Sequence, residues 1–136
     1  MKTYVLDANA VIRYLEFGRD WEKVRTLFER TAEEDIKLFI SVINWGEVIY
    51  TTAKKVGLSK AISDINTLSS ALETIPAGEA ETEAAVSLKH NFKLGYADSF
   101  AAALALSRNA TLVTADPEFA KLGKRLKVMT LRRHTE

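Results

Sequence analysis

The sequence contains no cysteine, which excludes disulfide scaffolds, iron–sulfur centres, thiolate zinc sites and cysteine nucleophiles. Its six glycines never fall in the spacing G-x-x-x-x-G-K-[ST] of a phosphate-binding loop, which argues against an NTPase. No run approaches the roughly 20 apolar residues of a membrane span. The N-terminus shows no export pattern, because Asp7 interrupts its first apolar stretch. We therefore predict a soluble, cytoplasmic protein.

The sequence has no large excess of either sign of charge, since 19 Lys+Arg balance 18 Asp+Glu. A chain of 136 residues, 47% of them hydrophobic, fits one domain spanning residues 1–136 with a single core. Positive charge gathers near the C-terminus, where Lys121, Lys124, Arg125, Lys127, Arg132 and Arg133 face only Glu136 among the acids. This basic stretch is either a solvated end of the chain or a surface that contacts phosphates.

Short β-rich runs alternate with longer helical ones along the chain. The pattern predicts strands at 4–6, 38–40, 73–76, 111–114 and 127–129. It predicts helices at 21–31, 41–55 (capped by Ser41), 59–72, 79–91 and 96–108, and a short turn helix holding Phe119 and Leu122. Strands separated by helices indicate βα units and right-handed crossovers. The expected fold is a three-layer α/β/α sandwich around a short, mostly parallel sheet.

Four acidic residues stand alone among apolar neighbours: Asp7, Glu47, Asp98 and Asp116. A carboxylate in such a setting costs several kcal/mol of desolvation unless it is paired or binds a metal. Asp7 and Asp116 could simply cap the turns after their strands, and Asp98 could complement a helix dipole. Glu47 falls in the middle of a helix and has the weakest structural explanation.

Topology gives these acids a common place, because the functional crevice of an open parallel sheet lies at the carboxyl ends of its strands. Asp7 and Asp116 each follow a predicted strand, and Glu47 lies about two helical turns beyond another. The edge occupied by Asp98 is not determined by the sequence.

The donor types indicate which metal such a site would take. The two histidines, His90 and His134, lie far in sequence from the acids and are expected at the surface. Clustered oxygen ligands without Cys or His suit Mg²⁺ or Mn²⁺, ions that serve phosphoryl chemistry. Asn9 and Thr114 could position a water molecule or the ligands by hydrogen bonds.

Four motifs in order, VLDAN, SVINWGEV, ADSFAAALA and TLVTADPEF, resemble the PIN domain over essentially the whole chain. More narrowly they resemble VapC, the toxin subunit of the VapBC toxin–antitoxin systems. The resemblance implies a Mg²⁺- or Mn²⁺-dependent ribonuclease whose catalytic and metal-binding acids are Asp7, Glu47, Asp98 and Asp116, with Asn9 and Thr114 as auxiliary polar residues.

The same resemblance implies assembly with other molecules. It implies a homodimer, an RNA substrate, and an antitoxin whose C-terminal segment blocks the site. It also implies basic residues beside the acidic pocket, for which Arg13 and the cluster at 124–133 are the candidates.

The leading hypothesis is an endoribonuclease, and two alternatives stay open. One is a non-catalytic RNA- or protein-binding module that keeps the scaffold without turnover. The other is a phosphotransferase with Asp7 as its nucleophile, although Asn9 stands where a second acid would be expected and no lysine lies in an obvious phosphate-binding motif.

Overall fold

The computed structural model describes residues 1–33 and 35–133. In chain order its elements are β1 (Lys2–Leu6), α1 (Ala8–Leu15), α2 (Trp21–Ala32), β2 (Ile36–Ser41), α3 (Val42–Val56), α4 (Leu58–Asn66), β3 (Leu72–Ile75), α5 (Glu79–Phe92), α6 (Tyr96–Ser107), β4 (Thr111–Thr114), the 3₁₀ helix η1 (Pro117–Arg125) and β5 (Val128–Thr130). No helix in this part of the chain has the length and apolar character needed to cross a membrane.

The five strands form one sheet in the order β3-β2-β1-β4-β5, and every neighbouring pair is parallel. Successive side chains of a strand point to opposite faces, so each strand supplies both layers. Leu6 and Val113 pack on one face, whereas Val5 and Leu112 pack on the other. Strands buried on both faces read as continuous apolar runs, which is why the short sequences YVL and LFI predict strands.

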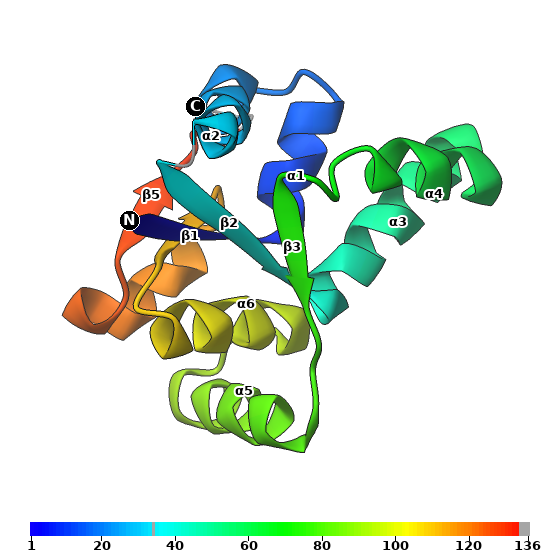
Figure 1. Ribbon diagram of the computed structural model, residues 1–136. Helices are drawn as coiled ribbons and strands as arrows, with labels where there is room; N and C mark the ends of the chain where they lie inside the picture. The colour runs from blue at the N-terminus through cyan, green and yellow to red at the C-terminus, as the bar shows by residue number, and fades with distance from the viewer. Residues whose placement is uncertain (34, 134–136) are drawn as a thin grey trace.

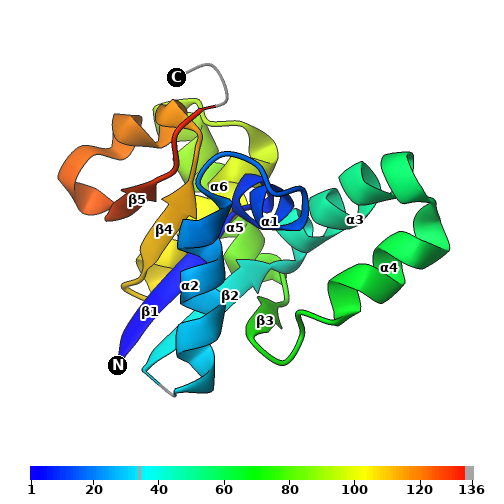
Figure 2. The same ribbon diagram turned by 90° about the horizontal axis from the view of Figure 1, so that it is seen from above.

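Helices cover both faces of the sheet, as Figures 1 and 2 show. Helices α1 to α4 contribute to the core on one face, and α3 and α4 form a hairpin that extends beyond the sheet. On the other face, α6 and η1 pack against the strands, and α5 lies on α6 (Figure 1). The predicted three-layer α/β/α sandwich is confirmed.

The order of the strands locates the crevice. From β1 the chain moves outward to β2 and β3, then returns to the other side of β1 to form β4 and β5. The direction of winding thus reverses between β1 and β4, and such a reversal opens a crevice at the carboxyl ends of the two strands. Asp7 follows β1 directly, and Asp116 lies two residues beyond the end of β4.

Two features differ from the elements predicted from the sequence. The predicted helix at 59–72 is wrong beyond Asn66, because Leu68 lies in a turn and Leu72 begins β3, paired with Leu38. These leucines keep a helical spacing, but both are buried through turn and strand geometry. Helix α1 has no predicted counterpart, although its N-cap Asp7 and the apolar face that buries Ala8, Ala10 and Val11 are local signals.

Candidate active site

The acids predicted from the sequence meet in one cleft of about 230 Å³, although they come from four different elements. Asp7, Asn9, Glu47, Asp98 and Asp116 all line it, together with Ala8, Ile12 and Thr51. The structure therefore also settles the edge that the sequence left open for Asp98. Thr114 does not line the cleft; it is fully buried behind Asp7.

Asp7 is the most deeply buried of the four, with only 4% of its surface exposed. One carboxylate oxygen caps α1 by accepting a hydrogen bond from the Ala10 backbone N–H at 2.9 Å, and the other accepts one from the Thr114 hydroxyl. Burial raises the pKa of Asp7 from its usual 3.8 to about 7, although both hydrogen bonds oppose this rise by favouring the charged form. Near neutral pH, Asp7 is therefore partly protonated and partly ionised in the folded protein.

A chain of hydrogen bonds continues from Thr114 into η1. The Thr114 hydroxyl oxygen accepts a bond from the Asp116 backbone N–H at 3.0 Å, and an Asp116 carboxylate oxygen accepts one from the Glu118 backbone N–H at 2.9 Å. Asp116 is thereby the N-cap of η1, and Pro117 begins that helix with its φ already restricted. Local sequence therefore determines the orientation of Asp116.

Asp98 lies in the first turn of α6, where the helix dipole favours a negative charge. Burial, followed by the nearby charges of Asp116 and Glu47, raises its pKa from the usual 3.8 to about 6. Gly95, the N-cap of α6, leaves room for this carboxylate, since a Cβ at position 95 would lie 3.2 Å from Asp98 Oδ2. The carboxylates of the cleft therefore repel one another.

Asn44 supports the site although it does not line the cleft. Its side-chain amide donates to Glu47 Oε1 at 3.2 Å and to the Ala97 carbonyl oxygen at 3.1 Å, which joins α3 to the first turn of α6. Asn44 is 1% exposed, and its Oδ1 has no hydrogen-bond partner within the described residues. The position three residues before Glu47 on the same helix could have indicated it, because residues at that spacing are neighbours on a helix surface.

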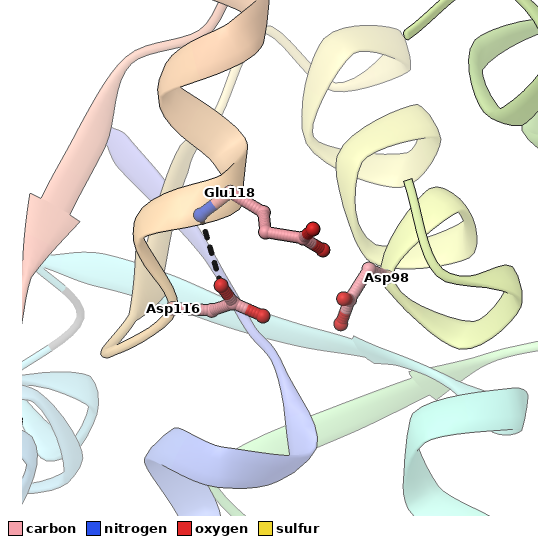
Figure 3. A group of neighbouring side chains, drawn as sticks. All are labelled: Asp98, Asp116 and Glu118. Carbon is pink, nitrogen blue, oxygen red and sulfur yellow. Dashed lines mark hydrogen bonds between the residues drawn. The ribbon is translucent and has the colours of Figure 1, made fainter. Parts of the chain in front are cut away.

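The closest group of oxygens is formed by Asp98, Asp116 and Glu118, whose carboxylates converge in Figure 3. One oxygen from each lies within 4.8 Å of the others. Glu118 does not qualify as an isolated acid, because charged residues flank it on both sides, Asp116 two residues before and Lys121 three residues after. The cluster therefore contains two of the predicted acids and one that sequence reasoning missed, while Asp7 and Glu47 line the same cleft outside it.

No cation of the protein neutralises most of this charge. Among residues 1–33 and 35–133, Asp7, Glu47, Asp98 and Asp116 form no ion pair, and Glu118 alone pairs with Lys121 at 3.4 Å. A site composed of carboxylate oxygens fits Mg²⁺ or Mn²⁺, and raised pKa values are expected where like charges crowd without a counter-ion.

Two of the basic residues expected beside the pocket, Arg13 and Arg132, instead join the C-terminal segment to the α1–α2 loop. Arg13 is buried and donates to the carbonyl oxygens of Arg19 and Arg132, so it fastens the C-terminal segment to the α1–α2 loop. Arg132 itself pairs with the buried carboxylate of Asp20 at 2.9 Å, an interaction that lowers the pKa of Asp20 well below its usual range. His90 is exposed on α5, and His134 lies outside the described residues.

Comparison with known proteins identifies the family. The model of the PIN domain matches residues 4–125. The chain belongs to the PIN domain family. The resemblance indicated by the sequence motifs is thereby confirmed. The comparison with curated proteins gives no match.

Solved structures share this PIN fold with the chain over nearly its full length. VapBC2 from Rickettsia felis bound to a DNA fragment from its promoter is 22% identical, with a TM-score of 0.73 over 94% of this chain and 98% of that chain. DNA-bound VapBC from Salmonella typhimurium is 20% identical, with a TM-score of 0.75 over 96% and 98%. A toxin–antitoxin complex from Klebsiella pneumoniae is 24% identical, with a TM-score of 0.65 over 93% and 96%.

Proposed function

We propose that this PIN-domain protein is a metal-dependent endoribonuclease that hydrolyses RNA phosphodiester bonds and acts as the toxin of a toxin–antitoxin pair. The observation that carries the proposal is the convergence of five carboxylates: Asp7, Glu47, Asp98 and Asp116 line one cleft, and Glu118 joins Asp98 and Asp116 in a cluster whose oxygens lie within 4.8 Å of one another. Four of the five have no cationic partner among the described residues. Such a concentration of negative charge is tolerated where a divalent cation and a phosphate meet.

Asp98, Asp116 and Glu118 would hold Mg²⁺ or Mn²⁺, with Asp7 and Glu47 on the walls of the same cleft. When bound, such an ion lowers the pKa of a water molecule and stabilises charge on the attacked phosphate. Thr114 holds Asp7 through its carboxylate Oδ2, and Asn44 holds Glu47 through Oε1. Asn9 is exposed at the cleft and can donate its amide hydrogens to a substrate oxygen.

The geometry disfavours the phosphotransferase alternative. Both carboxylate oxygens of Asp7 accept hydrogen bonds, one as a helix cap, and the side chain is buried. A carboxylate nucleophile that must form an acyl phosphate needs an oxygen free to approach phosphorus. Asp7 instead acts as a fixed member of an acidic group.

The partners belong to the same proposal. Two of the similar solved structures are VapBC complexes and a third is a toxin–antitoxin complex, which supports an antitoxin partner for this chain. The proposal also includes a cytoplasmic location and a homodimer. Light scattering of the purified protein tests the homodimer.

The direct experiment is cleavage of RNA by purified protein with Mg²⁺, with Mn²⁺ and with EDTA, for the wild type and Asp98→Asn. We expect cleavage by the wild type only with metal, and none by the variant, whose circular dichroism spectrum stays unchanged. Asp64→Asn is the matched control, because Asp64 is an exposed acid of α4 outside the cleft. Cleavage retained by Asp98→Asn would refute the assignment, and RNA binding without any metal-dependent hydrolysis would favour the non-catalytic module.

A further inference from the structure

Two segments that lack acidic residues lie side by side in the fold. Residues 89–95 carry Lys89 and Lys93, and residues 121–127 carry Lys121, Lys124, Arg125 and Lys127. The first segment ends α5 and leads into α6, and the second is the C-terminal part of η1 with its continuation. Twenty-eight residues separate Lys93 from Lys121 in the chain, so only the tertiary structure joins their charges.

Direct contacts hold these segments together. The Lys121 ammonium donates to the Lys93 carbonyl oxygen at 3.4 Å, and the Arg125 guanidinium lies 5.3 Å from the centre of the Phe92 ring. Within the first segment, the Lys89 ammonium donates to the Leu94 carbonyl oxygen at 3.0 Å. The side chains that form this surface, here called the basic surface, are all exposed: Lys89, Lys93, Lys121, Lys124 and Arg125.

The basic surface adjoins the acidic cleft on two sides. Helix η1 carries Glu118 of the acidic cluster and, one turn later, Lys121, which forms an ion pair with it at 3.4 Å. The loop after Lys93 ends at Gly95, three residues before Asp98. Positive charge therefore begins where the acidic cluster ends. The acids of α5 (Glu79, Glu81 and Glu83) lie toward its other end, with Glu83 about 9 Å along the helix axis from Lys89.

We infer that the basic surface binds the phosphate backbone of single-stranded RNA next to the bond that is cut, an inference that rests on the proposed function. A strand bearing one negative charge per nucleotide is repelled by five carboxylates and needs cations beside them to remain bound. Exposed lysine and arginine side chains contact phosphates without regard to sequence. The surface thus supplies affinity and orients the strand, and it carries no base specificity.

The remaining basic residues of the C-terminal stretch have a different role. The Arg132 side chain pairs with Asp20, and the carbonyl oxygens of Arg132 and Arg133 accept hydrogen bonds from Arg13 and Arg19. An acidic protein segment is a less suitable occupant of the basic surface than RNA. An acidic protein segment that extended from the basic surface past Lys121 would be repelled by Glu118 and the other carboxylates. An RNA phosphate in the same place would instead lie at the proposed metal site.

The test measures RNA binding separately from cleavage. A fluorescent single-stranded RNA is titrated with protein in EDTA at several salt concentrations, for the wild type and for the triple variant Lys93→Gln, Lys124→Gln and Arg125→Gln. Lys121 is left intact because its loss would also unpair Glu118. The control triple variant Lys2→Gln, Lys37→Gln and Lys60→Gln removes the same charge from exposed positions at the amino ends of β1 and β2 and on α4. Within the described residues, the one ion pair lost with Lys60 is that with Asp64, which lies outside both the acidic cleft and the acidic cluster.

We expect the first triple variant to bind RNA about tenfold or more weakly than the wild type. Its slope of log K against log salt should be smaller by about 2, because each lost phosphate contact on a single strand removes about 0.7. The control variant should bind as the wild type does. Equal affinity and slope for the two triple variants would overturn the inference, as would absence of salt-dependent RNA binding by the wild type.

Two further results distinguish RNA binding by the basic surface from binding of an acidic protein and from the proposed nuclease function. If the triple variant binds RNA normally but no longer binds poly-glutamate, the surface recognises acidic protein and the inference is overturned. If the wild type binds RNA through the basic surface but never cleaves it with Mg²⁺ or Mn²⁺, the inference holds and the proposed nuclease function fails.

Discussion

The hydroxyl group of Thr114 donates a hydrogen bond to the carboxylate of Asp7, which ties the end of β4 to the end of β1. Both residues are buried, with 0% and 4% of their surfaces exposed. The bond lies at the reversal in strand order, so it crosses the crevice between the two halves of the sheet. Through Asp116, which donates its backbone N–H to the same hydroxyl, the bond also positions the start of η1.

Replacing Thr114 by Val tests this bond, because valine keeps the shape of threonine and removes the hydroxyl. The Asp116 N–H loses its acceptor and Asp7 loses a donor, so we expect the free energy of unfolding to fall by about 1–3 kcal/mol. Since the bond favours the charged form of Asp7, the pKa of Asp7 should rise and the pH profile of cleavage should shift upward.

Thr114→Ser is the control for that change, since serine keeps the hydroxyl. It should retain the pH profile of the wild type, measured as the rate of RNA cleavage from pH 5 to 9. A Val variant with the wild-type profile would show that Thr114 has a packing role only.

The raised pKa of Asp7 predicts how stability depends on pH. Between the unfolded value of 3.8 and the folded value of about 7, the folded protein binds more protons than the unfolded chain. The contribution of Asp7 to stability is therefore complete below about pH 4 and is lost as the pH rises through about 7. Asp98, with a pKa of about 6, acts in the same direction.

Urea denaturation in EDTA at pH 5 and pH 7.5 measures this loss. Asp7→Asn removes the titrating group while keeping a good helix cap, so its free energy of unfolding should exceed that of the wild type at pH 7.5 by about 1 kcal/mol or more. At pH 5 the difference should shrink. Asp64→Asn, far from the cleft, should follow the wild type, and parallel curves for Asp7→Asn and the wild type would contradict the expected burial cost.

A divalent cation should stabilise the folded protein, because it binds the acidic cluster only when the fold assembles it. At a hundredfold excess over its Kd the gain is about 2.7 kcal/mol, which corresponds to a rise in Tm of about 5–10 °C for a chain of this size. Thermal unfolding with and without Mg²⁺ or Mn²⁺ measures the shift. Asp116→Asn should lose most of it, and an equal shift in that variant would place the ion elsewhere.

Gly95 tests how closely Asp98 must be positioned. A Cβ at residue 95 would press on Asp98 Oδ2 from 3.2 Å, so Gly95→Ala should weaken metal binding and cleavage by about tenfold. The backbone of Gly95 suits any residue, with φ −61°, and the loss of stability should stay near 1 kcal/mol, because alanine is a poor N-cap.

Two variants separate crowding from capping. Gly95→Ser restores a good N-cap but keeps the Cβ, so it should be stable and still impaired in cleavage. Gly46→Ala adds a Cβ in open space within α3; it should raise the free energy of unfolding by about 1 kcal/mol and leave cleavage unchanged. Full activity of Gly95→Ser would show that the Asp98 carboxylate moves without consequence.

Much of the fold could be predicted because local patterns are strong where burial is complete. The strand at 111–114 and the helix capped by Ser41 are found as predicted, since an apolar run and a side-chain cap are local signals. The end of α4 was not predictable from spacing, because Leu68 and Leu72 keep a helical interval although they lie in a turn and a strand. Helix α1 was missed although it has a side-chain cap and an apolar face.

The sequence by itself marked Asp7, Glu47, Asp98 and Asp116 as acids isolated among apolar residues, without any knowledge of the fold. The structure buries Asp7, half-buries Asp98 and Asp116 and leaves Glu47 exposed, so isolation in sequence did not determine burial. Only the tertiary structure decided that Asp98 and Glu118 face Asp116, that Asn44 holds Glu47, and that Lys93 lies against Lys121. The reason is physical: the neighbours of an acid in sequence show only that its segment is apolar, whereas its burial, and the partner that offsets the cost of that burial, come from other elements. That partner is chosen by the order of the strands and the packing of helices across them.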